Sequence, residues 1–197
     1  MNRYLYALVR YYIIFFSFIK NRLFMKLYGV SYGSSLHTCG GVIFRKSDGK
    51  ISIGNNVTIN SHILANPIGG DSKTILAVFG SKSELIICDN VGISNAAIVA
   101  HCHICIGEGT IIGSGCKIYD TDFHSIYPEF RHSGNTHVKS SPINIGKNVF
   151  VGAHSLILKG VTVGEGSVIA AGSIVTRNIP PYEIWGGNPA RFIRKLY

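Results

Sequence analysis

Residues 145–176 read IGKNVFVGAHSLILKGVTVGEGSVIAAGSIVT, and the spacing of their apolar residues points to one architecture. A branched side chain recurs at every sixth position, namely at Ile145, Val151, Ile157, Val163, Ile169 and Val175. Two residues before each of the last five stands another small or branched residue: Val149, Ser155, Val161, Ser167 and Ser173. Residues at i and i+2 lie on one face of a strand, whereas a helix needs a period of 3.6 or 3.5. The spacing therefore predicts a parallel β-helix of hexapeptide repeats, in which two side chains of each short strand point inward.

The same period extends toward the N-terminus, with interruptions. It begins at residue 51, and residues 66–70 predict a turn before a strand at 74–79. Residues 120–142 lack the repeat and predict one long excursion loop, which in a compact domain is usually functional. Three strands of six residues make a coil of about eighteen residues, so we expect roughly five coils.

These patterns divide the chain into three parts. We expect an N-terminal helical segment over residues 1–30 and the β-helix over 31–180. A C-terminal tail follows over 181–197, where residues 191–196 predict a short helix.

The composition restricts the class of protein and its partners. The chain has 197 residues, 46% hydrophobic and only 15% charged, which argues against a disordered chain. Its net charge of +9 suits an anionic membrane, a phosphorylated ligand or nucleic acid. We expect no nucleic acid, because neither a recognition helix nor a basic stacking motif is evident. Five cysteines, an odd number, without a secretory signal pattern predict reduced thiols in the cytoplasm.

The N-terminal segment differs from the rest of the chain. Residues 4–19 are almost wholly apolar or aromatic, and the unbroken run at 11–16 is shorter than the about 20 residues that span a bilayer. Basic residues flank this stretch: Arg3, Lys20, Arg22 and Lys26. Two interpretations stay open, a helix lying in the inner membrane interface and a helix packed on the protein or on a neighbouring subunit.

An ordered set of motifs then narrows the fold and the activity. The motifs are IGNNV at 53–57, VGIS at 91–94, IYDTDFHS at 118–125, the stretch at 145–176, and GNPAR at 187–191. Together they resemble the hexapeptide-repeat acetyltransferases, in the branch of the galactoside, maltose, nodulation-factor and bacterial polysaccharide O-acetyltransferases. The resemblance covers about residues 50–195. It implies a left-handed β-helix, homotrimers, and acetyl-CoA bound in the groove between neighbouring prisms.

The resemblance also assigns a catalytic residue. His124 matches the family's catalytic histidine, which as a general base would take the proton from a sugar hydroxyl during direct acetyl transfer. Without the resemblance, His124 would be interpreted as a solvated loop side chain. For Asp120 we favour capping of a turn. Asp122 either does the same, or it orients His124 or contacts the sugar.

Further positions match the family's binding residues. Small side chains allow a backbone to bind the pantetheine arm, and guanidinium groups suit phosphates. The implied acetyl-CoA contacts are Phe150, where relatives often have Trp, with Ala153, Ala171, Thr176, Arg177 and Arg191. On the acceptor side, Ser94 and Asn95 match residues that contact sugar hydroxyls in relatives. The string at residues 101–105, HCHIC, resembles a metal site, but no second ligand pair follows at zinc spacing. We interpret it as structural and expect no metal.

The sequence thus predicts an acetyl-CoA-dependent O-acetyltransferase acting on a sugar hydroxyl of a glycan or glycan precursor. Three alternatives stay open. The first is N-acetylation of an amino nucleotide-sugar on the same fold. The second is a metal-dependent hydratase of the carbonic anhydrase type, which needs three histidines at a metal between subunits. The third is a non-enzymatic solenoid, which needs neither a loop histidine nor a coenzyme groove.

Overall fold

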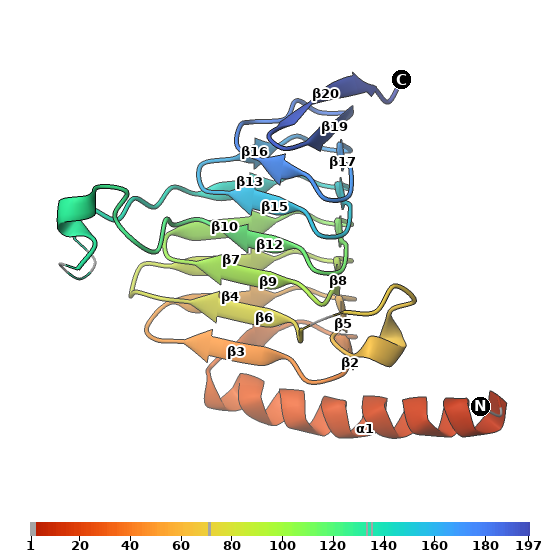
Figure 1. The fold of residues 1–197 in the computed structure, drawn as a ribbon. Coiled ribbons are helices and arrows are strands. Elements are labelled where there is room, and N and C mark those ends of the chain that lie inside the picture. Colours follow the sequence, from red (N-terminus) through yellow and green to blue (C-terminus); the bar gives the residue numbers. More distant parts are fainter. Residues whose placement is uncertain (1–2, 71, 133, 135) are drawn as a thin grey trace.

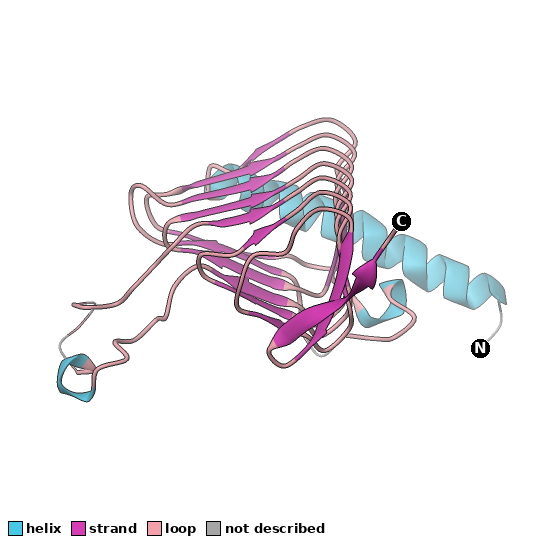
Figure 2. Ribbon diagram, turned by 90° about the horizontal axis from the view of Figure 1, so that it is seen from above, coloured by secondary structure: helices cyan, strands magenta, loops and turns pink. Residues whose placement is uncertain are grey.

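The computed structural model describes residues 3–70, 72–132, 134 and 136–197, and shows a three-sided prism of short strands (Figures 1 and 2). Sheet 1 contains β1 (Ser31–Tyr32), β4 (Lys50–Ile53), β7 (Glu84–Ile87), β10 (His103–Ile106), β13 (Ile143–Ile145) and β16 (Thr162–Val163). Sheet 2 contains β2 (His37–Cys39), β5 (Thr58–Asn60), β8 (Gly92–Ser94), β11 (Ile111–Ile112), β14 (Phe150–Val151), β17 (Val168–Ile169), β19 (Glu183–Gly187) and β20 (Ala190–Lys195). Sheet 3 contains β3 (Ile43–Lys46), β6 (Ile75–Val78), β9 (Ala97–Ala100), β12 (Lys117–Tyr119), β15 (Leu156–Leu158) and β18 (Ile174–Val175). The chain visits the sheets in turn as a left-handed parallel β-helix, so the predicted fold class is confirmed, with six strands in sheets 1 and 3 instead of the roughly five coils expected.

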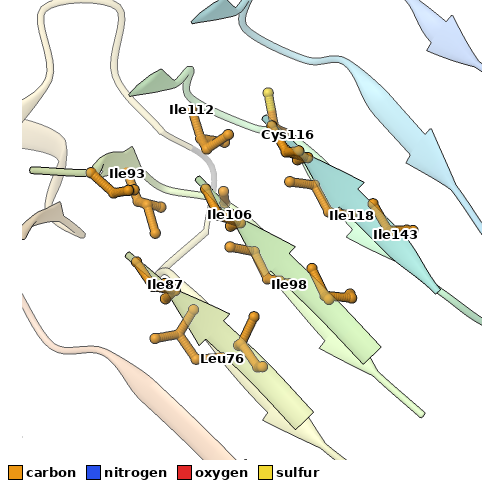
Figure 3. Close-up of a cluster of buried hydrophobic side chains, with 14 of the residues drawn as sticks. Leu76, Ile87, Ile93, Ile98, Ile106, Ile112, Cys116, Ile118 and Ile143 are labelled. Carbon is orange, nitrogen blue, oxygen red and sulfur yellow. The ribbon is translucent and has the colours of Figure 1, made fainter. Parts of the chain in front are cut away.

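The core is the column of side chains that point into the prism. The residues of the six-residue series at 145–175 are all buried, and so are the residues two positions before them. Isoleucines from successive coils stack on one another along the axis (Figure 3). The serines of the series satisfy their hydroxyls at the corners: Ser167 donates to the Pro180 carbonyl oxygen over 2.7 Å. The six-residue period therefore identifies the side chains that point into the prism, as the sequence predicts.

The corner between sheets 1 and 2 explains a second recurring feature of the sequence. In coil after coil one residue there has a positive φ: 54° at Asn56, 60° at Asn90, 69° at Gly109, 54° at Asn148 and 64° at Gly166. Glycine and asparagine are the residues that adopt this left-handed conformation most readily. The corner therefore selects Asn or Gly in these five coils, whereas Ser35 adopts the same conformation, with a φ of 54°, in the first coil.

Two excursions leave the prism at different corners. The first follows β5, contains η1 (Ile63–Ala65) and returns at β6, as the predicted turn and strand require. The second is the loop at 120–142, which contains η2 (Pro128–Phe130) and projects away from the prism (Figure 2). Its base is closed where the Asp122 N–H donates to the Lys139 carbonyl oxygen over 3.0 Å and where Thr121 pairs with Ser140.

The helix α1 (Arg3–Leu27) crosses the N-terminal end of the prism and extends beyond it (Figure 1). It is held there by a buried polar row. Asn21 accepts from the Val42 N–H over 2.9 Å and donates to the Gly40 carbonyl oxygen over 3.0 Å, while the Gly40 N–H donates to Ser17 Oγ. Among the described residues, no helix combines the length and apolarity needed to cross a membrane.

The C-terminal tail corrects one prediction. Residues 191–196 do not begin a helix, because β20 runs antiparallel to β19, which itself continues sheet 2 in parallel with β17. The hairpin supplies backbone partners to the last coil, for example the Ala170 N–H donating to the Trp185 carbonyl oxygen over 2.8 Å. Pairing with the exposed end of the sheet thus outweighs local helix propensity.

The cysteines form no disulfide among the residues that the structure describes. All five are free thiols, and burial raises the pKa of the Cys116 thiol to about 11. Since the thiolate is the reactive form, Cys116 is expected to be chemically inert at neutral pH.

Candidate functional site

His124 lies where the regular coils give way to the long loop. After β12 the chain turns sharply, and the His124 N–H donates to the Asp122 carbonyl oxygen over 2.7 Å. The His124 side chain is exposed and borders a cleft of about 510 Å³ on the outer face of sheet 3. The cleft is otherwise lined by Arg45, Ile75, Ala77, Phe79, Val99, His101 and Phe123. An exposed imidazole on a rigid sheet edge has the accessibility that a general base requires.

A chain of rings forms the wall of this cleft next to His124. The Phe79 and His101 ring centroids lie 5.1 Å apart, those of His101 and Phe123 5.7 Å, and those of Tyr119 and Phe123 5.5 Å. Phe123 adopts a φ of 59°, which a bulky residue rarely does. The ring contacts hold Phe123 in this conformation, and thereby fix the backbone immediately before His124.

Asp120 stabilises the turn that leads from β9 into β10. Its buried carboxylate accepts three backbone N–H groups, from His101 at 2.7 Å, Cys102 at 2.8 Å and His103 at 2.7 Å. Asp120 follows β12, which pairs with β9, so the next coil supplies the acceptor for these donors. The capping role that we favour for Asp120 is confirmed, because its carboxylate accepts hydrogen bonds from the backbone of residues 101–103. Among the described residues, no group of three or more His, Cys, Asp or Glu side chains is placed to hold a metal ion.

Replacing Asp120 with Ala is expected to lower the free energy of unfolding by about 3 kcal/mol, since three N–H groups lose a charged acceptor. Urea denaturation measures this loss. Asp120→Asn keeps one acceptor oxygen and should fall in between. The matched control is Asp48→Ala, which removes an exposed carboxylate and should change stability by less than about 0.5 kcal/mol. Equal losses for Asp120→Ala and Asp48→Ala would contradict the bracing role.

Asp122, the predicted sugar contact, is engaged by the protein. Its Oδ1 lies 2.5 Å from Lys159 Nζ, and both side chains are largely covered. Lys159 follows β15, one coil beyond β12, so the pair ties the start of the loop to the next coil. Asp122 thereby braces the turn that carries His124, and its contact with a sugar stays a prediction.

The predicted acetyl-CoA residues lie elsewhere on the prism. Ala153 and Ala171 stack at the corner between sheets 2 and 3, where the Gly172 N–H donates to the Ala153 carbonyl oxygen over 2.8 Å. Phe150 is 48% exposed on the outer face of sheet 2, between Ile111 and Val168 of the neighbouring strands. The other three predicted contacts are exposed residues of the last coil and the tail: Thr176, Arg177 and Arg191.

One chain does not bring these groups together with His124. His124 follows the C-terminal end of a sheet 3 strand, whereas Ala153 and Ala171 precede the N-terminal ends of sheet 3 strands. The two edges of the sheet are separated by a strand of three to four residues, about 10–13 Å. The predicted base and the predicted coenzyme slot therefore lie on opposite edges of one sheet.

The acceptor residues occupy the same corner as the alanines, nearer the N-terminus. Asn95 is 2% exposed, and its side-chain N–H donates to the Ser72 carbonyl oxygen over 2.7 Å. A Cβ at Gly70 would lie 2.3 Å from Asn95 Cγ, so the first excursion packs directly on this amide. Asn95 thus has a structural position, and Ser94 beside it is half-buried. Sugar contacts at both residues stay predictions.

Sequence reasoning missed the residues that line the His124 cleft, above all Arg45, Phe79 and His101. Stacking the hexads three strands apart would have placed Arg45 over Ala77 and Ala77 over Val99, as their register shows. That signal was obscured by the first excursion, which shifts the frame between Arg45 and Ala77.

Comparison with known proteins finds a family model that matches part of the repeat region. Residues 142–177 match the family model described as the hexapeptide repeat of succinyl-transferase, and the same period organises the coils from β4 to β18. This stretch is therefore similar to the hexapeptide-repeat family. Phe150, Ala153 and Ala171 fall inside the matched residues, whereas His124 precedes them.

Curated proteins similar to this chain include acetyltransferases. It is 51% identical over 67 residues to a Staphylococcus aureus (strain MRSA252) protein named as an acetyltransferase, with 34% of each chain covered. It is 41% identical over 102 residues to the galactoside O-acetyltransferase of Escherichia coli (strain K12), covering 52% of this chain and 49% of the relative. The chain thus spans between a third and a half of the length of these relatives.

A solved structure shares the fold over most of the chain. It is a variant of AntD, an N-acyltransferase from Bacillus cereus, in complex with dTDP-4-amino-4,6-dideoxyglucose and coenzyme A. The TM-score is 0.69 at 24% identity, with 89% of each chain covered. At this identity the likeness establishes the prism architecture.

Proposed function

We propose that the protein is an acetyl-CoA-dependent O-acetyltransferase that acts on a sugar hydroxyl of a glycan or glycan precursor. The observation that carries the proposal is the exposed His124 imidazole, fixed beside an open cleft at the edge of sheet 3. The 41% identity to a galactoside O-acetyltransferase supports the choice of an oxygen acceptor.

In the proposed reaction, His124 accepts the proton of the sugar hydroxyl while its oxygen attacks the thioester carbonyl carbon. A C–O bond forms, the C–S bond breaks, and the coenzyme A thiolate takes the proton back from the imidazolium. Such proton transfer typically contributes about 10²–10⁴ in rate. No acyl-enzyme is required. The ring contacts of Phe123 and the Asp122–Lys159 ion pair hold the backbone turn that carries His124.

The residues of the last coils fit the coenzyme. Ala153 and Ala171 leave the corner backbone approachable, as an extended pantetheine arm requires. Phe150 offers an exposed apolar wall, and the exposed guanidinium groups of Arg177 and Arg191 suit the phosphates.

The separation of the base from this slot supports a second part of the proposal. We infer that the protein acts as a homotrimer, in which His124 of one protomer faces the Ala153–Ala171 corner of its neighbour. Closed cyclic symmetry would then repeat the same site three times.

An acceptor screen with radiolabelled acetyl-CoA and a panel of glycans tests the proposal. The expected product is an ester, which hydroxylamine cleaves; a hydroxylamine-resistant amide would replace O-transfer by N-acetylation. Isothermal titration with coenzyme A separates both enzymes from a non-enzymatic solenoid, which would release no heat of binding.

A further inference from the structure

The helix α1 carries an apolar stripe that the rest of the chain leaves uncovered. Every residue of the stripe is between 51% and 70% exposed. The members are Leu5, Leu8, Tyr12, Phe16, Ile19, Leu23 and Leu27. Their spacing of three or four residues places them on one face of the helix.

This stripe points away from the prism. The opposite face of α1 holds the buried residues Ser17, Asn21 and Met25, which contact the first coil. At 3.6 residues per turn, Ile19 points about 160° away from Asn21. Because α1 crosses the N-terminal end of the prism, no later coil can reach the stripe (Figure 1).

The charges on α1 suit an anionic surface. The first turn holds no acidic residue, and none follows in the rest of the helix. Lys20 and Arg22 lie on either side of the stripe, each about 80° from its centre, while Lys26 stands near its C-terminal end. Arg22 stacks on the Phe18 ring of α1 and on the Tyr32 ring of β1. Aromatic and aliphatic residues with basic flanks are the composition of a helix lying in a membrane interface.

We propose that α1 lies in the interface of an anionic phospholipid bilayer, with the stripe immersed and the prism standing on its N-terminal end. The alternative is that a second copy of the chain covers the stripe. Pairing of two such stripes would give Lys20 and Arg22 no charge of opposite sign on the partner helix, because α1 holds no acidic residue, whereas an anionic bilayer supplies one. This inference does not depend on the proposed acetyl transfer.

Co-sedimentation of the full chain with lipid vesicles tests the proposal. We expect binding to vesicles of phosphatidylcholine with phosphatidylserine that exceeds binding to pure phosphatidylcholine at least tenfold. The double variant Phe16→Glu with Ile19→Glu should lose at least tenfold of this binding. The matched control, Ile126→Glu with Ile193→Glu, places the same charges at exposed apolar positions outside α1 and should bind like the wild type. Circular dichroism on melting verifies that both variants fold.

Light scattering after size-exclusion chromatography distinguishes pairing of two copies from binding to a bilayer. If the stripe pairs two copies, the wild type does not bind vesicles and its particle mass falls in the Phe16→Glu, Ile19→Glu variant. That outcome overturns the proposal, and so does equal loss of binding in the control variant. Neither outcome affects the acetyl transfer assay, so the two proposals fail separately.

The single tryptophan tests the upright orientation. Trp185 lies in β19, at the end of the prism far from α1 (Figure 1). Lipids with brominated tails quench only tryptophans in contact with them. We expect no quenching of Trp185 in the bound wild type, and strong quenching of Phe16→Trp in a Trp185→Phe background. Quenching of Trp185 without quenching at position 16 would show that the other end of the prism binds.

Discussion

We expect the His124→Ala variant to transfer acetyl groups about 10²–10⁴ times more slowly than the wild type, and its affinity for coenzyme A to stay unchanged. The reason is that the substitution removes the proton acceptor and nothing else: the side chain is exposed and lies on the sheet edge opposite to Ala153 and Ala171. Its stability should change by less than about 0.5 kcal/mol, as for other surface substitutions. Steady-state kinetics measures the first effect, and isothermal titration with coenzyme A measures the second.

The control for this variant is His132→Ala, which removes an exposed histidine from the same loop. It should retain nearly full turnover. If His124→Ala also turns over at a near-normal rate, His124 is not the base, and the proposed mechanism is wrong even if the protein proves to be an acetyltransferase.

Two inactive variants are expected to restore each other's activity when they assemble together. His124→Ala lacks the base, and Ala171→Trp blocks the coenzyme slot at an exposed corner position. Because the base and the slot lie on opposite edges of sheet 3, each proposed site takes the base from one protomer and the slot from its neighbour. In a random mixture of equal parts, about a quarter of the interfaces in a cyclic trimer combine an intact base with an intact slot. The mixture should therefore recover about a quarter of wild-type activity.

Co-expression of the two variants with different affinity tags isolates the mixed assemblies. Because one interface in each mixed cyclic trimer is intact, the purified mixed trimers should show about a third of wild-type activity. Each variant expressed alone serves as the baseline and should be nearly inactive. Mixed assemblies that stay at that baseline would show that one chain supplies both groups, or that the slot lies elsewhere.

The regular coils were predictable because the apolar positions of each hexapeptide identify the two side chains that point into the prism. Ile145 and Val151 are buried where the period places them, since a strand alternates its faces whatever its neighbours do. The partner of Asp120 was not predictable. The three N–H groups of residues 101–103 meet this carboxylate only after a full coil returns the chain to the same edge.

The N-terminal helix was harder to interpret for a physical reason. Its buried row contains Ser17 and Asn21, whose side chains bond to the backbone of the first coil, while its most apolar face is exposed. A pattern of hydrophobicity alone would assign the faces the other way round. The candidate site had a similar limit: sequence motifs name His124 and Ala171, but only the order of the strands places them on opposite edges.

The stacking of the coils fixes how far the imidazole stands from the end of the prism that α1 covers. β12, which leads into His124, is three strands from β3 in sheet 3, and strands lie about 4.8 Å apart, so the separation is about 14 Å. In a repeat structure of this kind the distance is a matter of counting: removing or duplicating one coil between α1 and β12 would move the imidazole by a single strand spacing. The number of coils below the loop thus acts as a spacer, and on a bilayer it would select acceptors whose hydroxyl lies at that height.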